Sequence, residues 1–329
     1  MTATRTVVSG LGTPESLRWH EGTLWFADLV DGTVQRLVPD GHPDGQGGQT
    51  AEVVATIPGR AGGLGWLPDG TLLAVSMDEC RIYRMTPDGQ VAVHADFADH
   101  AGGEGNDLLV DARGFAHVGN FGFDYTARTR DQPNAALYAP PGPPSTPIVS
   151  FAPDGSLAGV SAPALFPNGM VVLADGRTLV VAETLAFRLT AFTIEDTGAL
   201  SGPRTWAPMI PAWQWSALRS GGLVGAAARR ISALFDRPAI ARRSASPIAP
   251  DGIALGPDGS IWVANALRGE CVRVAEGGTV LERHAVEQIA LSCVLDGSGQ
   301  SLYVATVPSV DREIAGRLRQ GALVNICLS

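Results

Sequence analysis

Residues 258–274, DGSIWVANALRGECVRV, decide the fold, because they are one copy of a unit that recurs along the chain. Each unit has a glycine-containing turn, a short strand rich in β-branched and aromatic residues, and a second strand, which is typical of β-hairpins. The other copies begin at Glu21, Asp69, Arg113, Asp175 and Gly299. Six sheet-forming units of about 40 residues each predict an all-β fold, a six-bladed β-propeller.

The first strand of the chain indicates how such a ring would close. Residues 5–11, RTVVSGL, form a strand pattern without a hairpin of their own, and we expect them to complete the last blade beside residues 321–328, GALVNICL. Helical patterns do not alternate with the strands, which disfavours a parallel α/β fold. Residues 1–329 are therefore expected to be a single propeller domain.

Composition limits the classes of partner. Hydrophobic residues make up 45% of the 329 residues and charged residues 17%, enough apolar material for a large core. The net charge is −9 and the chain lacks a basic cluster, so we expect a small-molecule substrate and no nucleic acid. No signal-like start or long apolar run occurs, which predicts a cytoplasmic protein without a membrane span. The four cysteines are widely spaced, which favours buried free thiols.

Four repeats place a polar residue at one shared position. Counting back from the glycine that marks each repeat gives Glu15, Asn106, Asn168 and Asp251, each just before an apolar strand. Turn chemistry alone would explain any one of them. Their common register instead predicts that all four side chains meet at the central channel. Such a site offers only oxygen ligands and a formal charge of −2, which suits Ca²⁺ best, with Mg²⁺, Mn²⁺, Zn²⁺ or Fe²⁺ as other candidates.

At these positions the sequence resembles the senescence marker protein (regucalcin)/gluconolactonase family. The resemblance is carried by Pro14-Glu15, Asn106-Asp107, Pro167-Asn168-Gly169, Pro250-Asp251-Gly252 and the stretch SCVLDGSGQSLYVAT at 292–306. It implies a six-bladed propeller with one divalent cation, usually Ca²⁺, and sugar-lactone hydrolysis in many members. It also implies that Glu15, Asn168 and Asp251 are metal ligands, and that Asn106 contacts substrate or the metal.

Two further residues are candidates for catalysis. Family members that act on sugar lactones usually carry an arginine two residues before the channel asparagine, where this chain has Glu104. A carboxylate cannot supply the donors of a guanidinium, so Glu104 is either an acid/base, a group that binds a cationic or hydroxylated part of the substrate, or a solvated loop residue. His100 lies close to Asn106 in sequence and is either an acid/base at the channel mouth or an ordinary loop histidine.

The predicted function is metal-dependent opening of a lactone, with cation polarisation of the carbonyl and Asp251 as the carboxylate that activates water. Two alternatives are phosphotriesterase-like or other metal-assisted chemistry on a nonsugar substrate, and a non-catalytic Ca²⁺-binding scaffold.

Residues 208–247 form an insertion just before Asp251. From Leu223 the apolar residues follow a helical period, and Trp213 and Trp215 precede it. We expect a lid over the channel mouth that favours a larger or less polar substrate than a simple sugar lactone. The alternatives are an interface for a homo-oligomer and a helix that lies on a membrane surface.

Overall fold

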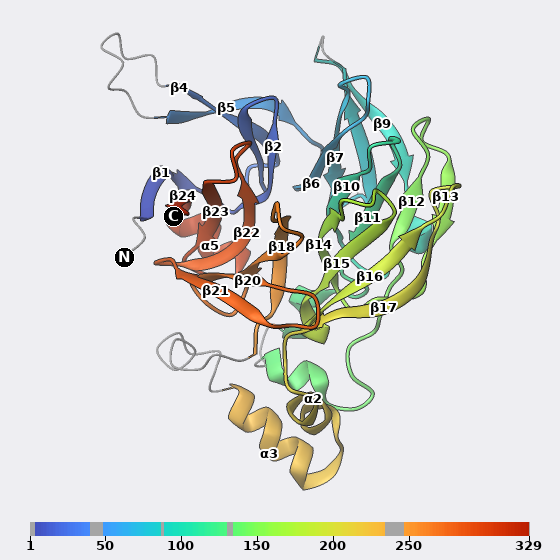
Figure 1. The fold of residues 1–329 in the computed structure, drawn as a ribbon, viewed down its shortest axis with the longest axis vertical. Coiled ribbons are helices and arrows are strands. Elements are labelled where there is room, and N and C mark those ends of the chain that lie inside the picture. The colour runs from blue at the N-terminus through green and yellow to red at the C-terminus, as the bar shows by residue number, and fades with distance from the viewer. Residues whose placement is uncertain (1–3, 40–48, 87–88, 130–133, 234–246, 329) are drawn as a thin grey trace.

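The computed structural model describes residues 4–39, 49–86, 89–129, 134–233 and 247–328. Within them the chain forms six four-stranded antiparallel sheets round a central axis, which confirms the six-bladed propeller (Figure 1).

Each blade begins with its innermost strand and proceeds outwards. Blade 1 contains β2 (Pro14–His20), β3 (Thr23–Asp28), β4 (Thr33–Pro39) and β5 (Gln49–Thr56). Blade 2 contains β6 (Ala61–Trp66), β7 (Leu72–Ser76), β8 (Arg81–Met85) and β9 (Val91–Asp96). Blade 3 contains β10 (Gly105–Val110), β11 (Ala116–Asn120), β12 (Val149–Phe151) and β13 (Leu157–Val160).

The second half of the ring repeats this order. Blade 4 contains β14 (Pro167–Val172), β15 (Thr178–Glu183), β16 (Arg188–Ile194) and β17 (Leu200–Pro208). Blade 5 contains β18 (Pro250–Leu255), β19 (Ile261–Asn265), β20 (Glu270–Val274) and β21 (Val280–Ala285). Blade 6 contains β22 (Ile289–Leu295), β23 (Ser301–Val307) and β24 (Gly321–Cys327), and β1 (Thr4–Leu11) supplies its outer strand.

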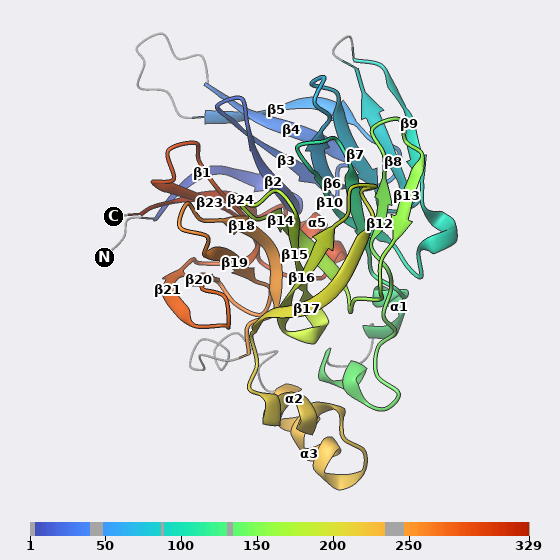
Figure 2. The same cartoon turned by 45° about the vertical axis from the view of Figure 1, so that its right-hand side comes forward.

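The ring closes as the sequence predicts. β1 pairs antiparallel with β24, with Thr4 opposite Ile326 and Leu11 opposite Gly321. The last blade is therefore built from both ends of the described chain, which lie side by side in Figures 1 and 2. This pairing removes the sheet edge that β24 would otherwise expose.

Glycines let the inner strands approach closely. β2, β6, β10, β14, β18 and β22 contact one another in a closed ring. A Cβ atom on Gly63 of β6 would lie 2.0 Å from the backbone nitrogen of Leu108 in β10, and one on Gly169 of β14 would lie 2.6 Å from the backbone oxygen of Asp251 in β18. A side chain at either position would force neighbouring blades apart.

Helical segments lie within blades 3, 4 and 6 and between blades 4 and 5. α1 (Tyr125–Thr129) and the 3₁₀ turn η2 (Asn134–Tyr138) lie between β11 and β12, and α5 (Arg312–Leu318) lies between β23 and β24. α2 (Ala212–Arg219) and α3 (Gly222–Ser232) follow β17 and project from the propeller body (Figure 2). Two shorter 3₁₀ turns are η1 (Ala98–His100) and η3 (Thr184–Ala186). No helix in the described ranges is long and apolar enough to cross a membrane.

The insertion differs from the single helix that the period predicts. It holds two helices, and Ser220 and Gly221 separate them, with Gly222 opening α3 at a φ of +64°. The backbone turn at Gly222 requires a left-handed conformation that few other residues adopt. Leu234 and Phe235, which continue the apolar period that starts at Leu223, lie outside the described residues.

The cysteines are free, as expected, but only three of them are buried. Cys80, Cys271 and Cys293 lie in the core, whereas Cys327 near the end of β24 is exposed. Cys327 is the last residue of β24 and the only exposed one in that strand, whose other residues are buried or half-buried.

Candidate functional site

The four aligned polar residues occupy the same place in four blades. Glu15, Asn106, Asn168 and Asp251 are the second residues of β2, β10, β14 and β18, and all four line one cavity. In each of these strands the pairing register shifts at this position or directly after it. A bulge of this kind re-aims a side chain away from the sheet, here into the channel. The convergence that the common register predicts is therefore present.

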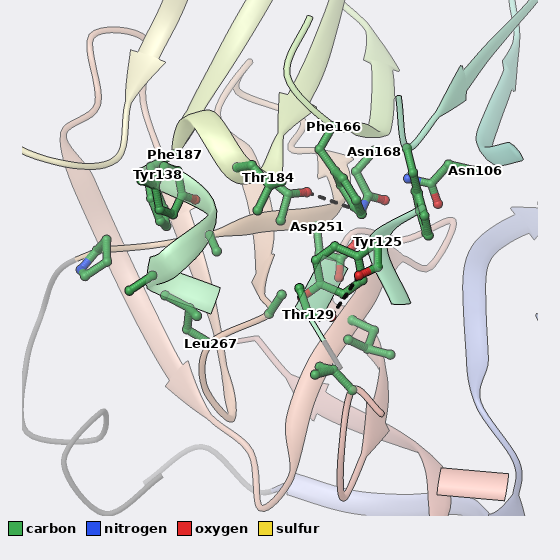
Figure 3. A pocket seen from close by; sticks show the side chains of 18 of the residues that line it. Asn106, Tyr125, Thr129, Tyr138, Phe166, Asn168, Thr184, Phe187, Asp251 and Leu267 are labelled. Carbon is green, nitrogen blue, oxygen red and sulfur yellow. Dashed lines mark hydrogen bonds between the residues drawn. The ribbon is translucent and has the colours of Figure 1, made fainter. Parts of the chain in front are cut away.

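Hydrogen bonds fix how the two amides face the cavity. Asn106 donates from Nδ2 to the carbonyl oxygen of Pro167 at 2.9 Å. Asn168 donates from Nδ2 to Oγ1 of Thr184 at 3.3 Å, and Thr184 in turn donates to the carbonyl oxygen of Pro250 at 2.7 Å (Figure 3). Because the NH₂ groups have acceptors, the Oδ1 atoms of both amides are left to face the site.

The two carboxylates are held in a setting that disfavours their charge. Burial, with a smaller contribution from the charge of Asp107, raises the pKa of Glu15 to about 7. Burial and then the charge of Glu15 raise the pKa of Asp251 well above its usual range. Asp251 is 6% exposed, and its Oδ1 is buried without a hydrogen-bond partner. Such an orphaned carboxylate oxygen is costly unless a ligand satisfies it.

A third acid nearby is neutralised by an arginine that sequence reasoning missed. Arg18 of β2 donates from Nη2 to Oδ1 of Asp107 at 2.8 Å and to the carbonyl oxygen of Leu108 at 2.6 Å. Its Nε donates to the carbonyl oxygen of Leu64 at 3.0 Å. This one side chain ties together the inner strands of blades 1, 2 and 3. No local motif marks it, because its partners lie in other repeats.

These residues fit a divalent cation. Two amide oxygens, the unpartnered oxygen of Asp251 and a carboxylate of Glu15 form the all-oxygen set that Ca²⁺ accepts. Among the described residues no cluster of three or more His, Cys, Asp or Glu side chains is placed to hold a metal. The candidate set therefore depends on both amides, which suits Ca²⁺ better than Zn²⁺.

The cavity above the four residues is large and has two kinds of surface. Its volume is about 1250 Å³. We call the four aligned polar residues the floor of the cavity and its aromatic and aliphatic lining the wall. Figure 3 shows Asn106, Asn168 and Asp251 of the floor near Tyr125 and Phe166 of the wall. The wall includes Phe121, Tyr125, Tyr138, Phe166, Phe187, Trp213 and Leu218. A cavity of this size and composition suits a small molecule with an apolar body.

Part of the wall comes from a segment that the repeat pattern did not single out. The connection between β11 and β12 supplies Phe121, Tyr125 and Tyr138, and η2 contacts α2 and α3. Phe121 stacks on Phe166 with ring centroids 4.3 Å apart. Phe166 has a φ of +58°, a strained conformation for a residue with a side chain, directly before Pro167 and Asn168.

Glu104 and His100 have different places. Glu104 lines the cavity, where its Oε1 pairs with Arg60 at 2.8 Å and its Oε2 with Arg312 at 2.6 Å. Its side chain is 23% exposed and paired with two arginines, and its role in catalysis stays a prediction. His100 ends η1 and is not among the described residues that line the cavity. The structure thus gives no support to His100 as an acid or base, and its role stays a prediction. His117, by contrast, is buried and hydrogen-bonds Ser150.

The fold and the site together define a class: a six-bladed propeller whose channel mouth holds an oxygen-rich pocket beneath an apolar cavity. The family model described as SMP-30/gluconolactonase/LRE-like region matches residues 13–308, and the chain belongs to this family. No curated protein sequence is similar enough to count as a match.

Solved structures show the same fold at low sequence identity. A gluconolactonase from Xanthomonas campestris is 20% identical, with a TM-score of 0.67 over 100% of this chain and 90% of its own. A luciferin-regenerating enzyme is 15% identical, with a TM-score of 0.69 over 99% and 95%. A calcium-binding regucalcin from Agrobacterium tumefaciens is 17% identical, with a TM-score of 0.64 over 99% and 93%.

Proposed function

We propose that the protein is a hydrolase that opens a lactone with the help of a divalent cation, Ca²⁺ in the first instance. The observation that carries the proposal is the convergence of Glu15, Asn106, Asn168 and Asp251 on the floor of one cavity, with Oδ1 of Asp251 unpartnered. The family membership and the gluconolactonase among the similar structures support it.

Each residue has a part in this proposal. Glu15, Asn168 and Asp251 would hold the cation, with Asn106 beside them. When bound, the cation supplies Lewis-acid polarisation of the ester carbonyl. Asp251 accepts a proton from the attacking water while the water oxygen bonds to the carbonyl carbon. Asp251 then returns this proton to the ring oxygen as the bond between the ring oxygen and the carbonyl carbon breaks. Asn106 would orient the substrate from its place on the floor beside the cation ligands.

The cavity favours a lactone larger or less polar than a simple sugar lactone. Aromatic side chains and the helices α2 and α3 form much of its surface, and Val224 and Ile231 of α3 line it. Sugar lactones expose hydroxyls on most carbons, and an apolar wall leaves such groups without partners. We therefore propose that the insertion acts as the substrate-contacting lid.

The test is hydrolysis of a panel of lactones, from aldonolactones to bulky aromatic lactones, with Ca²⁺ and after chelation. We expect chelator-sensitive turnover that is fastest for the apolar members. Asp251→Asn should lower kcat by at least about 100-fold, as loss of a general base does. Asp258→Asn is the matched control, because Asp258 lies in a turn of the same blade and pairs with Arg273. Turnover near wild type in Asp251→Asn would remove Asp251 from its role, and no turnover across the panel would remove the lactonase function.

The insertion has its own test. Val224→Ser and Ile231→Ser should shift preference towards polar lactones, since both residues line the cavity. Leu223→Ser is the control: Leu223 is 90% exposed and is absent from the described lining of the cavity. If Leu223→Ser alone changes the oligomeric state and none of the three changes selectivity, the insertion is an interface and not a lid.

A further inference from the structure

A chain of alternating charges runs along the cavity, which Arg60, Glu104 and Arg312 line. Asp78 accepts from Nε of Arg60 at 2.8 Å, Arg60 pairs with Oε1 of Glu104, and Oε2 of Glu104 pairs with Arg312. Arg60 is therefore held between two carboxylates. The side chains are 23% to 42% exposed, so these ion pairs position one another more than they stabilise the fold.

Arg312 is held differently. Only its Nη1 has an acceptor, Oε2 of Glu104, and among the described residues its Nε and Nη2 have none. Its guanidinium lies over the ring of Phe121, 5.2 Å from the centroid, and its side chain is 25% exposed. Arg312 lines the cavity, so these donors are available at the cavity surface.

The backbone at Arg312 is also fixed. It is the first residue of α5, and the side chain of Asp311 caps that helix by accepting from the backbone nitrogens of Glu313 and Ile314. A capped helix start holds the residues of the first turn in place. A stacked, ion-paired guanidinium on a capped helix loses little conformational freedom when it binds a ligand.

The pair bridges the channel mouth. α5 belongs to blade 6 and Glu104 directly precedes β10 of blade 3, so the ion pair joins opposite sides of the ring of six blades. Arg312 and the floor residues line the same cavity.

Arg319, at the other end of α5, is an arginine with a structural role and serves as a comparison. Its Nη1 and Nη2 donate to the two carboxylate oxygens of Asp31 at 2.9 and 2.7 Å. Both terminal nitrogens therefore have an acceptor within the protein. Arg312 uses Nη1 to pair with Glu104, whereas Nε and Nη2 have no acceptor among the described residues. Free donors of this kind are expected of an arginine that binds a ligand.

We propose that Arg312 is a specificity-determining residue, which donates hydrogen bonds from Nε and Nη2 to an oxygen of the substrate remote from the reacting ester. Glu104 is its positioning residue. The acceptor is an oxygen of a hydroxyl or carboxylate group at one end of an otherwise apolar molecule. This inference deepens the proposed function, because it concerns the ligand of the same cavity. Arg312 also lies beyond residues 13–308, the part that matches the family model.

The probes are γ-lactones whose alkyl side chain ends in a methyl, a hydroxymethyl or a carboxylate group. Arg312→Met keeps an unbranched stem over Phe121 and removes the donors. We expect it to lower kcat/KM for one or both oxygen-bearing lactones by about 10- to 100-fold, the effect of losing hydrogen bonds to a charged group. The methyl-ended lactone, which offers no acceptor, should lose least. The oxygen-bearing lactone whose kcat/KM falls more shows whether Arg312 binds a hydroxyl or a carboxylate group.

Two further variants separate positioning from structure. Glu104→Gln should move kcat/KM in the same direction as Arg312→Met, and the double variant should be no worse than Arg312→Met, because both act on one contact. Arg319→Met is the matched control and should preserve discrimination among the three lactones. Melting temperatures of all variants show whether a loss comes from unfolding.

Dissociation constants for the same three lactones and their ring-opened acids, measured by calorimetry, keep the two proposals separate. If wild type hydrolyses none of them, the lactonase function fails, and the role of Arg312 is judged on binding alone. The role of Arg312 is overturned if Arg312→Met discriminates among the three as wild type does, or if wild type shows no preference for an oxygen-bearing ligand in either measurement. A uniform loss for all three lactones in Arg312→Met also overturns it.

Discussion

Replacing Arg18 by methionine should destabilise the propeller far more than replacing a surface arginine. Arg18 pairs with Asp107, whose side chain is only 6% exposed, and also satisfies the carbonyl oxygens of Leu64 and Leu108. Removing one member of a buried ion pair costs about 3–5 kcal/mol, because the other charge stays buried without its partner. Arg18 retains some solvent contact and Asp107 still accepts from the backbone nitrogen of Leu108, so we expect the lower end, about 3 kcal/mol.

That loss of unfolding free energy corresponds to a measurable decrease in melting temperature. At about 2.1 cal/mol/K per residue, unfolding 329 residues has an entropy near 0.7 kcal/mol/K, so the melting temperature should fall by about 4 °C. Calorimetry with denaturant titration measures both quantities. The double variant Arg18→Met/Asp107→Asn should regain part of the loss, since it no longer buries an unpaired charge.

Arg36→Met is the matched control. Arg36 pairs with Glu52 at the same distance, 2.8 Å, but both side chains are more than two-fifths exposed. An exposed pair of this kind contributes about 0.5 kcal/mol. The reasoning is refuted if Arg18→Met and Arg36→Met cost the same, or if the double variant is less stable than Arg18→Met by the full cost of Asp107→Asn.

Three other outcomes follow from the ring and its floor. With Ca²⁺ chelated, the contribution of Glu15 to stability should be fully present below its unfolded pKa of about 4.5 and be lost as pH rises through about 7, so the melting temperature should fall over this range. Added Ca²⁺ should abolish this fall, and Glu15→Gln should make it smaller. Gly169→Ala should cost about 1–3 kcal/mol and weaken Ca²⁺ binding by calorimetry, because its Cβ would push β14 from β18; unchanged affinity would contradict this. Deleting residues 1–11 should expose the edge of β24 and cause association in sedimentation, whereas a stable monomer would contradict closure by β1.

The sequence predicted those features that depend on position within a repeat. The blade count, the closing strand and the shared position of Asn168 and Asp251 all follow from a pattern that each copy carries locally. The contacts of Arg18 and Arg312 do not, because they join different blades, and Arg312 meets Glu104 across 208 residues. A repeat gives the place of each strand in the ring, but not which long side chains meet across the channel.

The helices were harder to predict for a related reason. α5 has seven residues, too few for an apolar period to be distinctive, and its start is decided by the cap at Asp311. The residues of α1 and η2 lie in a long connection with no repeat of its own. Their role as a wall depends on contacts with α2 and α3, which no local pattern encodes.

The charged residues of the channel differ between the floor of the cavity and the place of Arg312. Packing six inner strands round one axis brings Glu15, Asp107 and Asp251 together. Of these three carboxylates, only Asp107 has a salt bridge with another described residue. Apolar residues at these positions would serve stability better, since buried unpaired carboxylates oppose folding. Under the proposed function, a bound cation would offset that cost at the floor, whereas Arg312 already has its counter-charge in Glu104 and keeps hydrogen-bond donors without acceptors among the described residues. Under the two proposals, a substrate would place its ester at the floor and a second oxygen beside Arg312, with an apolar body between them against the aromatic wall.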